Sequence, residues 1–135
     1  MSQIRNSDVI FGALAIICED QFFSQNNQDY NMRAQYLLAN FIIRYAPLDT
    51  LYREANGIPP TTENTDIVVI DPEDDFPLCN IFAPVAMEYL ASALVIDENE
   101  EISDRLFDRY INGILSIRQT LPAKQQAIID RYGFD

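Results

Sequence analysis

The chain has 135 residues, of which 48% are hydrophobic, and its 21 acidic and nine basic residues give a formal net charge of −12. This length suits one domain with a buried core and is too short for two independent domains, so we predict residues 1–135 as a single domain. The charge excludes a bare duplex or an anionic membrane as a tightly held ligand, because both are polyanions, and it favours partners with basic surfaces.

The acidic charge is concentrated in one part of the sequence. Residues 58–101 hold eleven Asp and Glu and no Lys or Arg. These acids bracket the apolar stretch IFAPVAMEYLASALVI (81–96), which has to be buried. Such a segment repels polyanions at short range and offers packing surface without an obvious catalytic group. This layout indicates a scaffold protein.

The N-terminal part of the sequence predicts two helices. Ser7 as the N-cap and Asp8 in the first turn predict a first helix that ends near Cys18. Its apolar residues cover more than one face, so this helix is either central or has one side against another subunit. Residues 31–46 return to a 3.6-residue period and predict the second helix. Pro47 leaves two alternatives for the stretch that follows it, a kinked continuation or a separate short helix.

An extended arm is predicted between the second and third helices. Residues 58–80 set the β-branched run IVVI between acids and prolines, which allows at most one short strand. Asn80 is the predicted N-cap of the third helix. Pro84 is compatible with that helix because it falls in the first turn.

Two further helices complete the predicted fold. The third is rich in alanine, so neighbours can approach it closely, and we place it at the centre of the core. After the acidic link DENEE, residues 102–121 carry a regular apolar stripe and predict the fourth helix. The tail 122–135 begins with proline and ends with exposed aromatic residues, and we interpret it as a docking tail. The predicted fold is therefore mainly α, a small bundle of about four helices with an extended acidic arm and a C-terminal tail.

Carboxylates are the first candidates for chemistry. The pairs Asp74 with Asp75 and Glu100 with Glu101 could act as general acid and base, but adjacent acids in such loops are far more often solvated, and it is burial that adapts a carboxyl group to catalysis. The runs DPEDD and DENEE offer oxygen ligands for calcium without the spacing or the turn glycine of a calcium loop. We predict no catalytic, cofactor-binding or metal-binding residue, and no enzyme activity.

The cysteines and the N-terminus indicate a reducing compartment. Cys18 and Cys79 have no C-x-x-C spacing and no nearby base, and a chain without histidine cannot complete a zinc site from them. The N-terminus lacks a signal peptide, and the longest apolar run is about half the length of a membrane span. We expect a soluble protein that is made in the cytosol, with free thiols.

Arginines on the fourth helix form a possible cationic stripe. Arg105, Arg109 and Arg118 could contact nucleic acid or the acids of a neighbouring chain. Asp104 and Asp108 lie between them and favour intrahelical ion pairs instead. A contact between these arginines and the acids of a neighbouring chain is favoured only in a ring, where a basic face of one copy can meet the acidic arm of the next.

The stretch DDFPLCNIFAPVAMEYLASALVIDENEEISDRLFDRYINGIL carries a resemblance to a known family. An acid-Phe-Pro-Leu turn leads into an alanine-rich helix, an acidic break follows, and a helix with repeated aromatic residues completes the pair. With the two preceding helices and the tail, nearly the whole chain resembles the head-to-tail adaptor (connector) proteins of tailed bacteriophages. The sequence departs from that pattern in its unusually apolar first helix and at Cys79.

The resemblance implies a structural virion protein. It implies a homo-oligomeric ring, a dodecamer in this family, between the portal protein and the tail or neck proteins, in a virion assembled from chains made in the host cytoplasm. The ring would line the channel through which DNA passes without specific binding, and an acidic lumen suits this role because phosphates find no counter-charge there. Residues 61–77 and the tail 122–135 would become ordered on docking.

A second class of function fits the same charge. An acidic inhibitor that mimics DNA could occupy the basic cleft of a nucleic-acid-binding protein. Such a mimic would spread its carboxylates in two phosphate-like rows, whereas these acids are concentrated in one arm and one loop. A small carboxylate hydrolase ranks last, since no residue spacing supports it.

Overall fold

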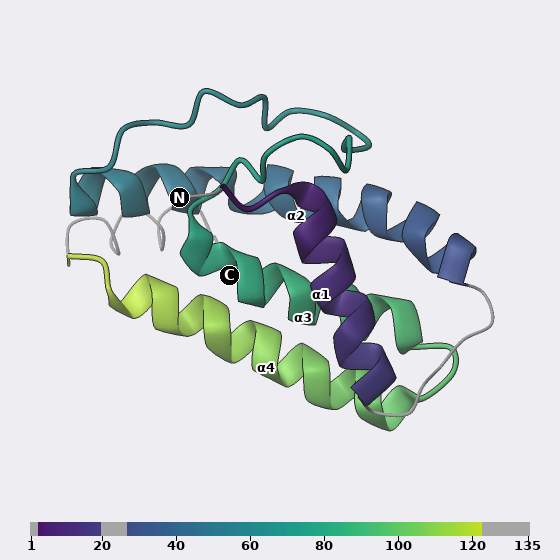
Figure 1. Ribbon diagram of the computed structural model, residues 1–135. Coiled ribbons are helices and arrows are strands. Elements are labelled where there is room, and N and C mark those ends of the chain that lie inside the picture. The colour runs from purple at the N-terminus through teal and green to yellow at the C-terminus, as the bar shows by residue number, and fades with distance from the viewer. Residues whose placement is uncertain (1–2, 20–26, 123–135) are drawn as a thin grey trace.

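The computed structural model describes residues 3–19 and 27–122, and this part of the chain is mainly helical (Figure 1). It contains no strand; an isolated antiparallel bridge joins Arg5 and Asp75. The predicted fold class, a small helical bundle, is confirmed. The docking tail predicted at 122–135 lies outside the described residues from 123 onward. The α-helices are α1 (Asn6–Glu19), α2 (Asn27–Asn56), α3 (Ala83–Val95) and α4 (Glu100–Gln119), and a 3₁₀ turn, η1 (Asn80–Phe82), precedes α3.

Helix α3 lies at the centre of the bundle, as its composition predicts. It contacts α1, α2 and α4, and nearly all of its small residues are buried. Close packing against α4 depends on Gly113, where an added Cβ would lie 2.8 Å from a methyl carbon of Val85. Helix α4 presents its predicted stripe to this core, with Leu106, Tyr110, Ile114 and Ile117 buried.

The link between α3 and α4 is fixed by polar groups. Asn99 is the N-cap of α4, and its side-chain oxygen accepts a hydrogen bond from the Ile102 amide at 3.1 Å. Ser92 and Ser103 are buried and exchange hydrogen bonds, because each hydroxyl donates to the carbonyl of the other, at 2.9 and 2.8 Å. Both buried hydroxyls are thereby satisfied, which lets the two helices approach closely.

Helix α2 passes through Pro47 without a break. Of the two alternatives for the residues after Pro47, the continuation is the observed one, since a single helix of 30 residues runs from Asn27 to Asn56. It ends at Asn56, and the φ of 67° at the following Gly57 is the left-handed conformation that glycine adopts readily at helix ends. The Ile58 amide donates to the Arg53 carbonyl at 2.9 Å and closes this end of the helix.

Two predicted caps are wrong. Helix α1 begins at Asn6, before Ser7, and the Ser7 amide donates to the Pro72 carbonyl at 2.9 Å. Asn80 does not cap α3 but begins η1, and the N-cap of α3 is Phe82 without a side-chain hydrogen bond. Pro84 does occupy the first turn, as predicted, and because it has no amide hydrogen it leaves one fewer donor to satisfy there.

Helix α1 lies at the surface and not at the centre. One of its faces packs against α3 through buried apolar residues, while Phe11 on the outer face is 60% exposed. Of the two alternatives for this helix, a central position is therefore not observed. A contact between its outer face and another subunit stays a prediction.

The packing at Gly113 gives a stability prediction. Alanine in place of glycine in a helix normally stabilises by about 1 kcal/mol. Here the new methyl group would overlap the stiff side chain of Val85, and overpacking costs about 1–3 kcal/mol. We expect Gly113→Ala to lower the free energy of urea unfolding by about 1 kcal/mol.

The matched control is Gly12→Ala on α1. An added Cβ there meets the far end of Met87, a flexible side chain that can move aside. We expect a smaller change than at Gly113. A Gly113→Ala variant more stable than the unmodified protein would contradict close packing of α3 and α4.

Candidate functional site

The arm between α2 and α3 (residues 58–80) is the most distinctive part of the surface. It runs along α2 and returns to α3, and it bears acidic residues and no base (Figure 1). Three of its apolar side chains, Ile70, Phe76 and Leu78, are buried in the core. Its carboxylates all point to solvent, so the arm is apolar inside and acidic outside. The exposed acids are Glu63, Asp66, Asp71, Glu73, Asp74 and Asp75.

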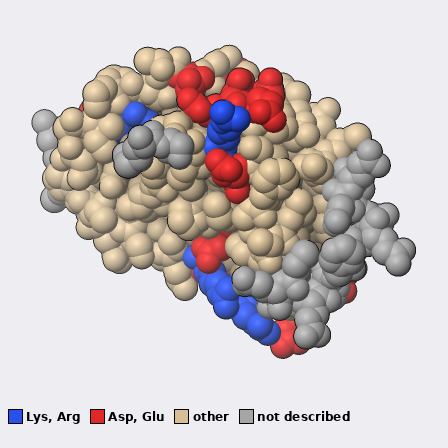
Figure 2. All heavy atoms as spheres, in the orientation of Figure 1, with Lys and Arg blue, Asp and Glu red and all other residues tan. Residues whose placement is uncertain are grey.

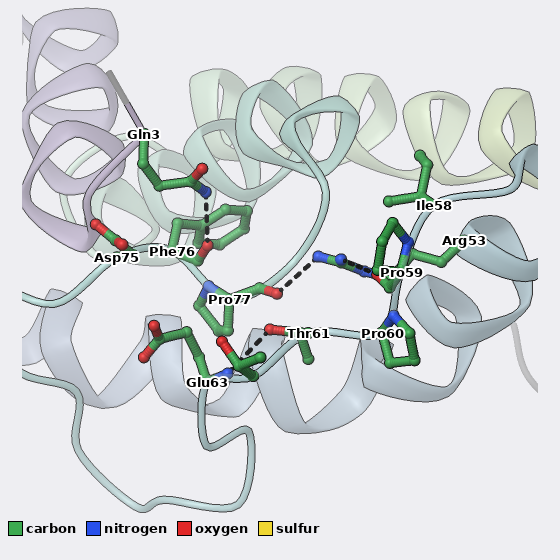
Figure 3. Close-up of a pocket in the computed structure, with 11 residues that line it drawn as sticks. Gln3, Arg53, Ile58, Pro59, Pro60, Thr61, Glu63, Asp75, Phe76 and Pro77 are labelled. Atoms are coloured by element: carbon green, nitrogen blue, oxygen red, sulfur yellow. Dashed lines mark hydrogen bonds between the residues drawn. The ribbon is translucent and has the colours of Figure 1, made fainter. Parts of the chain in front are cut away.

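Arg53 on α2 holds both ends of the arm. Its guanidinium donates to the carbonyl of Pro59 at 2.7 Å and to that of Pro77 at 3.1 Å (Figure 3). Its Nε donates to Asp49 at 2.8 Å, and the other oxygen of Asp49 accepts from the Cys79 amide at 2.8 Å. We call these residues the Arg53 clamp. A planar guanidinium suits this task, because its donors are fixed relative to one another.

The N-terminal segment provides a second attachment. The Phe76 amide donates to the Ile4 carbonyl at 2.8 Å, and the Asn6 amide donates to the Asp74 carbonyl at 2.9 Å. Arg5, in the same segment, forms an exposed ion pair with Glu73 at 3.5 Å. Carbonyl groups of the arm thus accept hydrogen bonds from backbone amides at the start of α1. Such amides have no partner within their own helix, and a side-chain cap commonly accepts their hydrogen bonds.

Open cavities lie around the clamp. One of about 300 Å³ lies between the two limbs of the arm, with Glu63 and Asp75 at its side and Arg53 at one end (Figure 3). Another of about 350 Å³ is lined by Tyr52, Cys79 and neighbouring residues. Within residues 3–19 and 27–122, no group of three or more His, Cys, Asp or Glu side chains could hold a metal ion. No chemistry follows from the residues that line these cavities.

Cys79 lies at the clamp with a thiol that resists ionisation. Burial and, to a smaller extent, the neighbouring Asp49 carboxylate raise the pKa of this thiol to about 11, against the smaller opposite effect of Arg53. A protonated thiol is a poor nucleophile. Cys79 is free, as expected, while the Cys18 side chain lies outside what the structure describes.

The remaining candidates from the sequence do not form one site. Asp74 and Asp75 are exposed on the arm, whereas Glu100 and Glu101 are in the first turn of α4.

Arginines of α4 interact with acidic residues of the same chain. Arg105 makes an exposed intrahelical ion pair with Glu101 at 3.8 Å, so the predicted kind of pairing is confirmed for this residue, with a different acid. Burial raises the pKa of Glu88 on α3, and the charge of Arg109 partly offsets this.

Sequence reasoning missed the clamp itself. Asp49 and Arg53 stand four residues apart on one helix, a spacing that indicates an ordinary surface ion pair. The sequence offered one indication of the clamp: Asp49 and Arg53 lie shortly before Pro59 and Pro60, near the end of a helix that Pro47 was expected to kink or break. That signal does not identify the carbonyls that Arg53 binds.

Comparison with known proteins identifies no relative. No family model, no curated protein and no solved structure matches the chain. In the described part of the chain, no helix has the length and apolar character needed to cross a membrane.

Removal of the Arg53 side chain should release the arm. In Arg53→Met the Asp49 carboxylate stays buried without its cation, and both Pro59 and Pro77 lose a donor. We expect a loss of about 3 kcal/mol in unfolding free energy, which is typical when one partner of a buried pair is removed. We also expect much faster proteolysis within 58–80, measured by mass spectrometry of the fragments. Arg105→Met, which removes an exposed pair, is the control and should change neither measurement.

The Cys79 thiol should report the same clamp. In a Cys18→Ser background, the rate of alkylation by iodoacetamide should reach half its maximum near pH 11 in the folded protein, against about 8.5 for an unfolded thiol. Because the folded pKa is the higher one, this group stabilises the fold below about pH 8.5 and that contribution is lost as the pH rises toward 11. Adding Asp49→Asn removes a negative neighbour, so the midpoint should fall. An alkylation midpoint that is the same with and without Asp49→Asn would contradict the contribution of Asp49 to the raised pKa of Cys79.

Proposed function

We propose that this chain is a structural protein of a tailed-bacteriophage virion, a head-to-tail adaptor that forms a homo-oligomeric ring between portal and tail. The acidic arm lines the DNA channel of that ring. The observation that carries the proposal is the arm, which presents six exposed carboxylates and no base from a backbone that the Arg53 clamp holds at both ends. The resemblance of the sequence to connector proteins supports the same function.

A wall of fixed carboxylates suits a channel for DNA. DNA binds proteins mainly by exchanging its counterions for Lys and Arg, and a surface without these groups offers no such exchange. At physiological salt the repulsion extends only about 8 Å, so it acts on DNA that comes close to the wall. The arm therefore keeps DNA from adhering without hindering its approach from a distance.

The distribution of charge favours this function over DNA mimicry. On the face that carries α1, acidic groups gather in the upper part of the view beside the arm, with a basic group among them, and a broad area has no charge. Basic and acidic groups alternate at the lower edge (Figure 2). A mimic needs rows of negative charge that follow a duplex backbone, and this face has none. The acidic inhibitor remains the second candidate, because the net charge of −12 fits it equally well.

The proposal predicts a ring whose lumen repels DNA. Light scattering should give a discrete mass well above the 15.5 kDa of one chain, and negative-stain images should show a central opening. Replacing Glu63, Asp74 and Asp75 with Lys should make the assembled ring retain duplex DNA at low salt, with binding that weakens steeply as salt rises. The unmodified ring should retain none in a mobility-shift assay.

A variant with the same charge change elsewhere controls for location. Glu54, Glu101 and Asp104 are exposed acids outside the arm, and their replacement with Lys gives the same net charge. Equal DNA retention by both variants would contradict a channel lined by the arm. A monomer at every concentration that also displaced DNA from a nuclease or repressor would favour the acidic inhibitor.

A further inference from the structure

A patch of apolar and aromatic side chains lies where α2, α3 and α4 meet, away from the arm. The members taken from α2 recur every four residues and so share one face of that helix. Met32 is 62% exposed, and the other large apolar members are also open to solvent, apart from the half-buried Tyr89. We call this surface the aromatic patch, and it consists of Met32, Tyr36, Asn40, Tyr89, Ile96 and Phe107.

Contacts between the helices join the middle of the patch across α2, α3 and α4. The Asn40 amide donates to the Tyr89 hydroxyl at 2.9 Å, which joins α2 to α3. The Tyr110 ring lies 5.1 Å from that of Tyr89 and 5.4 Å from that of Phe107, which joins α3 to α4. These rings are held by the core, so the patch is preformed.

Positive charge borders the patch. From Tyr30 to Leu48, helix α2 carries Arg33 and Arg44 and no acid, in a protein with a net charge of −12. Arg33 donates to the Ala93 carbonyl on α3 at 3.4 Å. Arg44 is exposed, and its charge acts on the Tyr110 hydroxyl, whose pKa burial raises and Arg44 lowers.

The arm carries a surface of complementary character. Val68 is 77% exposed and Val69 is also exposed, and their amides donate no hydrogen bond to any described residue. Asp66 and Asp71 flank them and are exposed. We call these four residues the arm knob, an apolar projection in an acidic frame.

The knob and the patch lie on opposite sides of α2. Ile42 lines a cavity beneath the arm together with Ile67 and Ile70, so its side of the helix faces the arm. Asn40, in the patch, is two residues away, which places it about 160° around the helix axis. A knob and a patch on opposite sides cannot meet within one molecule, but they can join successive molecules.

We propose that the arm knob of one copy docks in the aromatic patch of the next copy. Val68 covers the exposed rings, and Asp66 and Asp71 approach Arg33 and Arg44. Such a head-to-tail contact uses two different surfaces, and repeated with a rotation that closes it generates a ring. This inference rests on the proposed ring and names its subunit interface.

Substitutions in the knob and in the patch test each half of the contact. Val68→Asp puts a negative charge into the apolar centre of the knob. The double variant Tyr36→Asp, Arg44→Glu puts a negative charge into the patch and replaces a bordering positive charge with a negative one. Each should weaken self-association about 30-fold or more, the effect of losing an interface hot spot, measured by analytical ultracentrifugation. Leu115→Asp, at an exposed site on α4 outside the knob and the patch, should assemble normally, and circular dichroism should show the same fold for every variant.

Mixing the two defective variants gives the decisive measurement. The Val68→Asp chain keeps its patch and the Tyr36→Asp, Arg44→Glu chain keeps its knob, so an equimolar mixture has one intact contact and should form a particle of two chains. Neither variant should do so alone. Normal assembly of Val68→Asp, or a mixture that stays monomeric, would overturn the docking contact while the ring itself stands. An unmodified protein that never assembles would overturn both proposals.

Discussion

The structure depends on the buried pair of Asp49 and Arg53. Residues 58–80 form no helix beyond the first residue of η1 and no strand, so their backbone gains little from internal hydrogen bonds. Ordering a residue costs about 1–2 kcal/mol of conformational entropy. Three buried apolar side chains offset part of this cost, and the clamp fixes the two points between which the arm must run. Without those fixed points the same side chains would have many alternative positions.

The pair is effective because nearly all of its polar atoms are used. Arg53 donates to two carbonyls of the arm as well as to Asp49, and Asp49 accepts from Cys79 with its remaining oxygen. A buried ion pair stabilises a fold only when such additional hydrogen bonds compensate its desolvation. The pair also requires α2 to continue past Pro47, since both residues lie beyond the proline.

The sequence predicts the helices well because each depends on local spacing. The stripe of α4 and the small residues of α3 determine which faces are buried, and the structure agrees with both. The failures concern groups whose partners are distant in sequence. Ser7 and Asn80 are good caps by residue type, but contacts with distant residues set the backbone around them: the Ser7 amide donates to the Pro72 carbonyl and the Cys79 amide to the Asp49 carboxylate. The clamp was missed for the same reason, because backbone carbonyls leave no mark in the sequence.

The arrangement separates anchoring from charge within one segment. Ile70, Phe76 and Leu78 face the core, and the clamp binds carbonyls, so no arm carboxylate is needed to hold the arm in place apart from the exposed pair of Arg5 with Glu73. Exposed ion pairs contribute little to stability. The carboxylates can therefore respond to an outside partner without a cost to the fold. The proposed channel wall requires this independence, because charges that are to repel DNA must not be neutralised by the protein that presents them.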